Sequence, residues 1–386
     1  MKRPFLSLVL LFGLLIHAAA VHSQPAASTG AAADTEAPRG GEIPVGCLLP
    51  LSGKYANVGE RALKAILTAA GQGPSPGGYR LIVKDIGSEG RNLGPALGEL
   101  LAVPGLSFII GPIPSSYAAS AAEQASRAKV SMIVFPASES ESRGGPYVVE
   151  FFYPLEEQTR VLSSYAARDL GARTFGILYP DTGSGRELAA LFKKAATGSG
   201  GKIVYAKGYP PGETDLPGET EWIASIKPDA IFIPDGASAS AGLILRLKQN
   251  PRLSDVLFLG PATWNSPVFL KLAGDQIDGF VYRAVYTDFF HFGDAGWVGF
   301  GKDFESRHGE KPGSFEYLIY SGVSLMLKAA GGDGGDGQSF LKSLEELASS
   351  PGYKIKRDKA GGLQISPLPR ILSVSKGEII EIMKVK

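Results

Sequence analysis

The chain has 386 residues, of which 44% are hydrophobic and 20% are charged, and its formal net charge is +1. This length suits two ordinary domains better than one, and the balanced charge gives no reason to expect nucleic acid or an anionic membrane as a partner. Glycine (50) and proline (27) are abundant, which is typical of a chain with many turns between strands and helices.

The amino-terminal segment has the pattern of a secretory signal. Two basic residues precede an apolar run from Phe5 to about Ala20, which predicts a signal peptide over residues 1–23. A transmembrane anchor is the alternative, but the run is shorter than the ~20 residues that span a bilayer. Residues 24–42 are small and polar and predict a disordered tether. We therefore expect a soluble periplasmic protein, and its single cysteine, Cys47, can form no internal disulfide and lies too far along to carry a lipid.

The first structured unit is a strand, a loop and a helix. Ile43–Leu49 is almost continuously apolar, as expected for a parallel strand buried on both faces. Asn57 followed by Glu60 has the spacing of a capping box, which predicts the start of a helix, and Gly71 ends it.

Strands and helices alternate through the rest of the chain. Further strands are predicted at 79–84, 106–110, 131–135, 174–179, 202–206, 230–233 and 256–259. Helices are predicted at 93–102, 117–128, 161–170, 185–196, 219–226, 239–248 and 317–330. This spacing predicts βαβ units and an α/β fold of two Rossmann-like, doubly wound parallel-sheet lobes. A terminal hairpin is expected over 371–385, turned by Lys376-Gly377.

Each lobe is expected to combine segments that are distant in the sequence. The first lobe is assigned residues 43–153 with a return segment, 286–330, and the second lobe is assigned 154–285 with a carboxyl-terminal segment, 338–386.

Polar loops follow the predicted strands of the first lobe. In an open parallel sheet a ligand binds at the carboxyl ends of the strands, where helix amino termini converge. The loops at these ends are rich in serine and glycine, and their hydroxyl and NH groups can accept a carboxylate. The alternative is that Ser115, Ser116 and Ser138 only cap the helices that follow them.

Motifs of catalytic sites are missing. The sequence has no HExxH, GxSxG or GxxxxGK[ST] motif, and its first loop lacks GxGxxG. Asp181, Asp235 and Glu139 lie in separate loops, where solvated or helix-capping roles are the simpler interpretation. We therefore predict that the protein is not an enzyme and needs no cofactor or metal.

Five segments, in order, resemble the periplasmic solute-binding proteins of the leucine/isoleucine/valine-binding type. They are residues 45–63, 108–125, 130–140, 176–196 and 227–236. The resemblance implies a type 1 periplasmic binding protein fold and a hinged receptor that closes on a small polar ligand, carboxylate- or amide-like, for the membrane subunits of an ABC transporter. It also implies that Ser115 and Ser116 lie where the family binds the ligand carboxylate, and that Ala137, Ser138 and Glu139 complete the first-lobe half of the site.

The second-lobe half departs from the family pattern. Ser184 stands where amino-acid binders usually have an aromatic residue, and Ser321 stands where related chains often have Asp. Amino-acid binders of the family also use an acidic residue near the position of Trp264. These departures argue against an α-amino acid ligand. We expect Tyr55, Asp181, Ser184 and Trp264 to take part in the site, with Trp264 and the Asp181 loop closing over the ligand.

A second assignment on the same fold stays open. Residues 45–56 and the stretch near Asp278 are equally similar to the periplasmic activators of penicillin-binding proteins. Such a protein would act by contact with a peptidoglycan synthase, although the lipid-anchoring cysteine of the known activators is missing here.

Overall fold

The computed structural model describes residues 41–73, 78–87, 89–136, 145–277, 284–331, 337–349 and 352–384. These ranges fall within one compact unit, Arg39–Lys386. The predicted signal peptide and nearly all of the predicted tether lie outside the described residues. Within the described ranges, every helix is too short or too polar to cross a lipid bilayer.

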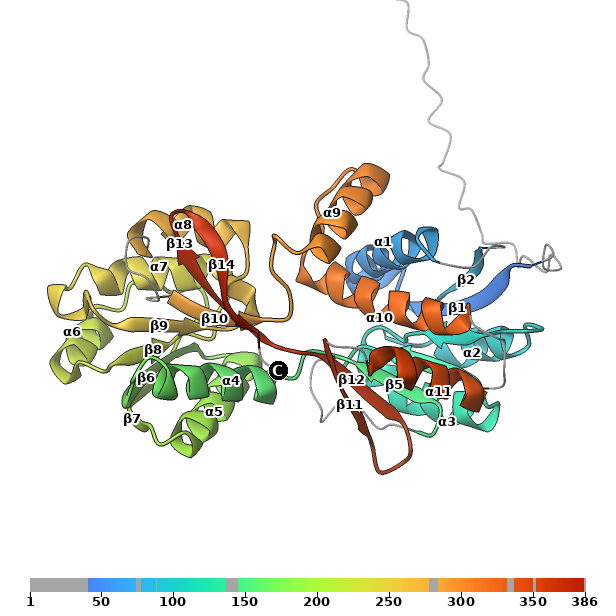
Figure 1. Cartoon of the computed structure of the whole chain (residues 1–386), viewed down its shortest axis with the longest axis horizontal. Helices are drawn as coiled ribbons and strands as arrows, with labels where there is room; N and C mark the ends of the chain where they lie inside the picture. The colour runs from blue at the N-terminus through green and yellow to red at the C-terminus, as the bar shows by residue number, and fades with distance from the viewer. Residues whose placement is uncertain are drawn as a thin grey trace, which may run out of the picture. The chain divides into compact units, whose positions relative to one another are not determined.

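The first of two seven-stranded sheets has the strand order β11-β12-β5-β4-β3-β1-β2 (Figure 1). Its pairs are parallel except for β11 with β12. From β1, next to the edge of the sheet, the chain goes to β2 on one side and then to β3 on the other, so the strand order reverses between β1 and β3. The strands are β1 (Ile43–Leu49), β2 (Tyr79–Asp85), β3 (Phe108–Ile110), β4 (Ser131–Val134), β5 (Val148–Phe151), β11 (Tyr353–Arg357) and β12 (Leu363–Pro367).

The second sheet repeats this plan in the order β14-β13-β10-β9-β8-β6-β7. Strands β6 to β10 are parallel, whereas β13 is antiparallel to β10 and β14. Its order reverses between β6 and β8, and the predicted fold of two α/β lobes is confirmed. The strands are β6 (Thr174–Pro180), β7 (Lys202–Tyr209), β8 (Ala230–Phe232), β9 (Leu257–Gly260), β10 (Ala284–Asp288), β13 (Arg370–Ser375) and β14 (Glu378–Lys384).

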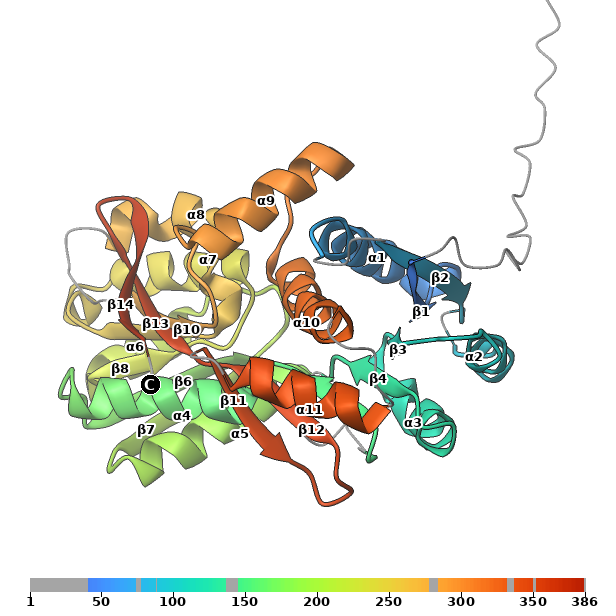
Figure 2. The same ribbon diagram turned by 45° about the vertical axis from the view of Figure 1, so that its right-hand side comes forward.

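Helices cover both faces of each sheet (Figures 1 and 2). One face of the first sheet packs on α1 (Ala56–Gly71), α9 (Ala295–His308), α10 (Ser314–Ala330) and α11 (Gly337–Ala348), and the other on α2 (Leu93–Leu101) and α3 (Ala118–Arg127). The second sheet packs on α4 (Leu155–Arg168) and α5 (Gly183–Gly198) on one face, and on α6 (Pro217–Ile226), α7 (Ala237–Lys248) and α8 (Pro267–Ile277) on the other.

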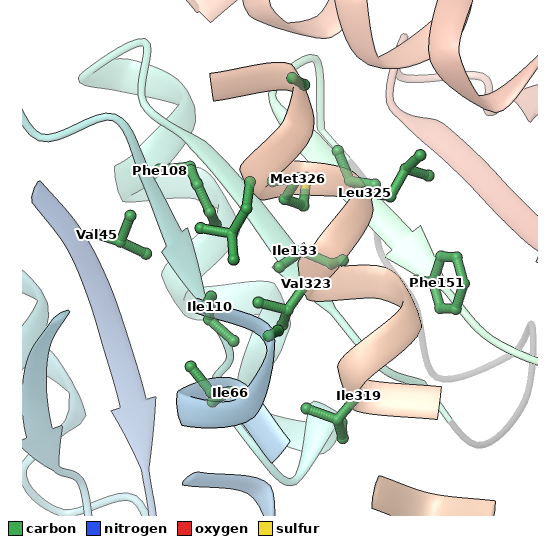
Figure 3. Close-up of a cluster of buried hydrophobic side chains, with 14 of the residues drawn as sticks. Val45, Ile66, Phe108, Ile110, Ile133, Phe151, Ile319, Val323, Leu325 and Met326 are labelled. Atoms are coloured by element: carbon green, nitrogen blue, oxygen red, sulfur yellow. The ribbon is translucent and has the colours of Figure 1, made fainter. Parts of the chain in front are cut away.

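Helix α10 returns from the second half of the chain to the core of the first lobe. Figure 3 shows its side chains beside those of the first-lobe strands. Val323 and Met326 are fully buried in one hydrophobic cluster with Ile110 and Ile133. Near the start of α10, the buried carboxylate of Glu316 forms an ion pair with Arg61 of α1. The first lobe therefore depends on segments more than two hundred residues apart in sequence.

The carboxyl-terminal segment is shared between the lobes, which corrects the prediction that residues 338–386 all join the second one. Helix α11 and the hairpin β11–β12 complete the first lobe, because β12 pairs with β5 and buries Leu363 and Ile365. Only β13 and β14 belong to the second sheet. The chain consequently passes between the sheets three times, after β5, after β10 and after β12.

The start of α1 also differs from the prediction. A 3-10 turn, η1 (Gly53–Tyr55), leads directly into the helix, and the NH of Ala56 donates to the carbonyl of Gly53. This turn satisfies the amino-terminal NH group that a capping box would otherwise serve. No side chain caps α1, so the capping box of Asn57 and Glu60 is wrong.

Candidate functional site

The loop after β1 borders the point where the first sheet reverses its strand order. Oδ1 of Asp85, at the end of β2, accepts hydrogen bonds from the backbone NH groups of Leu51 and Gly87, both at 2.8 Å. Burial alone would raise the pKa of Asp85, but the hydrogen bonds from Ser52, Gly87 and Leu51 together hold it below its ordinary value. Asp85 thus anchors the loop that carries Tyr55.

The loop after β3 lies against the end of β1. Gly111 has φ +96°, and a Cβ atom on it would come within 2.4 Å of the carbonyl oxygen of Leu48. The NH of Ile113 donates to that same oxygen at 3.3 Å. This close approach, which requires glycine, brings the 3-10 turn η2 (Ser115–Tyr117) to the carboxyl ends of β1 and β3. We use the word crevice for this strand-order reversal and for the equivalent one between β6 and β8. In η2 Ser116 is exposed, whereas Ser115 is only 8% exposed.

In the second lobe the equivalent position is the amino terminus of α5. Thr182 caps the helix, since its Oγ1 accepts from the NH of Gly185 at 3.0 Å, and Oγ of Ser184 lies 3.3 Å from it. Asp181 is exposed and pairs with Arg186 at 2.5 Å. A ligand here would meet a capped helix terminus flanked by one partly neutralised carboxylate.

Asp235, at the end of β8, occupies the other side of this second crevice. It accepts from the hydroxyl of Tyr209 at 2.8 Å and from the NH of Gly236 at 2.6 Å, and its carbonyl accepts from Thr263 at 2.7 Å. Burial and the nearby carboxylate of Asp235 raise the pKa of Tyr209. Sequence reasoning did not place Asp235 in the site, although it follows its strand much as Asp181 follows β6.

The predicted site residues therefore fall into three groups. Tyr55, Ser115 and Ser116 lie on the first-lobe crevice, and Asp181 and Ser184 lie on the second-lobe crevice. Ala137, Ser138 and Glu139 lie outside the described residues.

The predicted role of Trp264 in the site is wrong, because the side chain is buried in the second lobe. Its ring is 0% exposed and stacks on Phe269 in the second-lobe core, with ring centroids 4.6 Å apart. The tryptophan packs there because the loop after β9 turns it back under Gly260, where a Cβ atom would lie within 2.1 Å of the indole. We therefore remove Trp264 from the proposed site.

A fully buried carboxyl group, Asp288, ends β10 where the chain leaves the second sheet. Its Oδ2 accepts from Nδ2 of Asn265 at 2.9 Å, and its Oδ1 accepts from the NH of Phe289 at 2.7 Å. Burial raises the pKa of Asp288 to about 8, although these hydrogen bonds and the charge of Arg370 act in the opposite direction. Among the residues with described structure, no cluster of His, Cys, Asp or Glu has the arrangement of a metal site.

Two crevices at strand carboxyl ends, one in each lobe, form the arrangement in which open α/β sheets bind ligands. A family model described as periplasmic binding protein matches residues 42–362. The chain belongs to this family. Its type 1 fold and its resemblance to the leucine/isoleucine/valine-binding type are thereby confirmed. No curated protein matches the chain significantly in sequence.

Several solved structures of periplasmic binding proteins share the fold. A putative branched-chain amino acid ABC transporter protein from Rhodospirillum rubrum has a TM-score of 0.75 at 19% identity, covering 88% of this chain and 100% of its own. LivJ from Streptococcus pneumoniae, in complex with isoleucine, gives 0.60 at 19%, covering 88% and 99%. A solute-binding protein from Rhodopseudomonas palustris, in complex with 3,4-dihydroxybenzoic acid, gives 0.61 at 23%, covering 89% and 97%. The family and these neighbours are binding proteins rather than enzymes.

Proposed function

We propose that this chain is a periplasmic receptor that closes its two lobes on a small polar ligand and delivers it to the membrane subunits of an ABC transporter. The observation that carries the proposal is the pair of polar crevices, one at the strand-order reversal of each sheet. Neither crevice surrounds a ligand by itself. A ligand that contacts both would be enclosed only between the lobes, which three crossing segments join.

The chemistry of the crevices favours a carboxylate ligand without an α-amino group. Ser116 and the NH groups at the start of α3 offer donors, as does the capped terminus of α5 beside Ser184. In the second crevice, Asp235 already accepts two hydrogen bonds and Asp181 pairs with Arg186, so neither acid is uncommitted for a ligand ammonium group. Aromatic and aliphatic carboxylic acids fit this set better than leucine does.

A ligand screen by thermal shift tests the proposal. A molecule that binds only the folded state at a hundredfold excess over its Kd adds ~2.7 kcal/mol, which raises Tm by about 2 °C or more in a chain of this size. We expect such a shift with benzoates or small aliphatic acids and little or none with leucine or valine. Tight binding of leucine would contradict the argument from Ser184. If no small molecule binds but a peptidoglycan synthase does, the activator assignment replaces the receptor.

One pair of variants tests whether a ligand found in the screen contacts Ser116. Ser116→Ala should weaken binding by ~0.5–1.5 kcal/mol if its hydroxyl contacts the ligand. Ser120→Ala is the matched control, because Ser120 is an exposed serine one turn further along, and its hydroxyl donates to the carbonyl of Tyr117. Equal affinity of both variants would show that Ser116 takes no part in the site.

A further inference from the structure

A cavity of about 460 Å³ lies where α4 and α5 of the second lobe face the β11–β12 hairpin of the first. Phe152 and Pro154, in the crossing segment between β5 and α4, form part of its wall. The cavity is distinct from the crevices described above. Lys194, in the cavity lining, is ten positions after Ser184 in α5, which corresponds to a rise of about 15 Å along the helix axis.

The hairpin presents hydrogen-bond donors to this cavity. Lys354 and Lys356 are two residues apart in β11, so both side chains point to the same face of the strand. Across the hairpin Lys354 is paired in register with Ser366, and Lys356 with Gln364. Two ammonium groups, a hydroxyl and an amide therefore line one side of the cavity.

Cations also outnumber carboxylates around the whole cavity. The lining includes five basic side chains, Arg160, Arg168, Lys194, Lys354 and Lys356, and two acidic ones, Glu156 and Glu157. A third carboxylate, the buried Glu150 of β5, is paired in register with Gln364 of β12. It accepts a hydrogen bond from Nε2 of Gln364 at 2.8 Å. Even with Glu150 counted, the charge around the cavity stays positive.

The charge of Lys354 is only loosely compensated by its acidic neighbour. Glu157 is held by the guanidinium of Arg160, which donates to both carboxylate oxygens at 2.7 and 2.8 Å. Nζ of Lys354 lies 3.7 Å from the same carboxylate, farther than the ~2.7–2.9 Å of a charge-assisted hydrogen bond. An anion in the cavity could therefore gain Lys354 as a contact without breaking the pair of Glu157 with Arg160. Nζ of Lys194 donates to Oε1 of Glu156 at 2.8 Å, but both side chains are exposed, so an anion would share Lys194 with a well-solvated carboxylate.

Apart from Ser164, Gly198 and Ser199, the remaining lining is apolar and limits where an anionic group can sit. Leu191 and Ala195 of α5 join Phe152 and Pro154 as apolar surface. The last turn of α5, at Gly198, turns its carbonyl end toward this region and disfavours negative charge there. The volume lies within the usual range for small-molecule sites, ~300–1,000 Å³.

We propose that this cavity binds a small organic anion with an apolar body, held by Lys354 and Lys356 of the first lobe and by Lys194 of the second. The site goes beyond the proposed receptor function and needs no transport ligand. Because both lobes supply contacts, the affinity for the anion depends on how the lobes are arranged, and a bound anion in turn favours one arrangement.

Calorimetric titration of the full chain with naphthalene-1,5-disulfonate in 150 mM NaCl tests the proposal. We expect one site, and weaker binding of inorganic sulfate, which lacks the apolar body. Lys354→Gln and Lys194→Gln should each weaken disulfonate binding about 5-fold, and the double variant about 10-fold or more, as for partly exposed ion pairs. Loss from both single variants would show that the anion bridges the lobes.

Two further variants separate a built site from general surface charge. Lys302→Gln/Lys311→Gln removes the same charge from exposed positions outside the cavity lining and should leave binding unchanged. Ser164→Phe fills the cavity from α4 without changing charge and should abolish binding while the parent circular dichroism is retained. Absence of one-site binding, an equal loss in Lys302→Gln/Lys311→Gln, or full binding by folded Ser164→Phe would each overturn the proposal.

Discussion

Replacing Gly185 by alanine should lower the stability of the protein by about 2–3 kcal/mol, the usual cost of forcing an extra carbon into a packed position. A Cβ atom at Gly185 would lie 2.1 Å from the carbonyl oxygen of Pro180, which is backbone and cannot rotate away. Helix α5 would have to move off the end of β6. The gain in helix propensity, ~1 kcal/mol at most, does not offset this clash.

Gly183→Ala is the matched control, two residues earlier in the same helix. A Cβ atom there meets no heavy atom within 4 Å, so we expect unchanged or slightly higher stability. Denaturant unfolding of both variants measures the difference directly. The first lobe repeats the contact, since a Cβ atom at Gly59 would lie 2.2 Å from the carbonyl of Pro50, and Gly59→Ala should be similarly destabilised. Equal stability of Gly185→Ala and Gly183→Ala would refute the steric argument.

Asp288→Asn should stabilise the protein by a few kcal/mol at pH 8.5 and change it little at pH 4. In the folded chain the pKa of Asp288 is raised to about 8, whereas an unfolded aspartate titrates near ~3.9. Between these values the folded state binds more protons than the unfolded state, so the free energy of unfolding falls as pH rises. Asparagine stays neutral and removes that loss.

The difference in Tm between variant and parent, measured from pH 4 to 9, isolates this one group. The corresponding difference in unfolding free energy should increase with pH between about 4 and 8, by up to ~1.4 kcal/mol per pH unit, and level off above. Asp215→Asn, at an exposed position, is the control. A difference in Tm that does not vary with pH would contradict the raised pKa.

Local patterns predicted the elements whose residues interact with near neighbours. The apolar run Ile43–Leu49 gives β1 with its observed bounds, because a strand buried on both faces tolerates few polar residues. The sequence also predicted the turn of the terminal hairpin at Lys376 and Gly377. In the structure both residues adopt positive φ, as a two-residue hairpin turn requires. By contrast β11, YKIKR, exposes alternate charged residues, and it joins the first sheet only because its hairpin partner β12 pairs with the distant β5.

The site shows the same limit. The carboxyl-end rule located Ser116 and Asp181 on the two crevices, because that rule depends on chain order alone. It could not tell that Trp264 turns inward beneath Gly260, which depends on three-dimensional packing. Nor could that rule predict the hydrogen bonds that Tyr209 and Thr263 donate to Asp235, because these residues lie at or after the ends of three different strands.

The late closure of the first lobe has a consequence for the newly made chain. Its sheet begins at Ile43, but α10, α11 and β12 are synthesised only after strands β6 to β10 of the second lobe. Domains generally fold as units, amino-terminal first, during synthesis. Here the amino-terminal lobe lacks the helix that covers Ile110 and Ile133 until about residue 330, so these core side chains stay uncovered until then. A newly made first lobe therefore exposes apolar core surface until most of the chain has been synthesised.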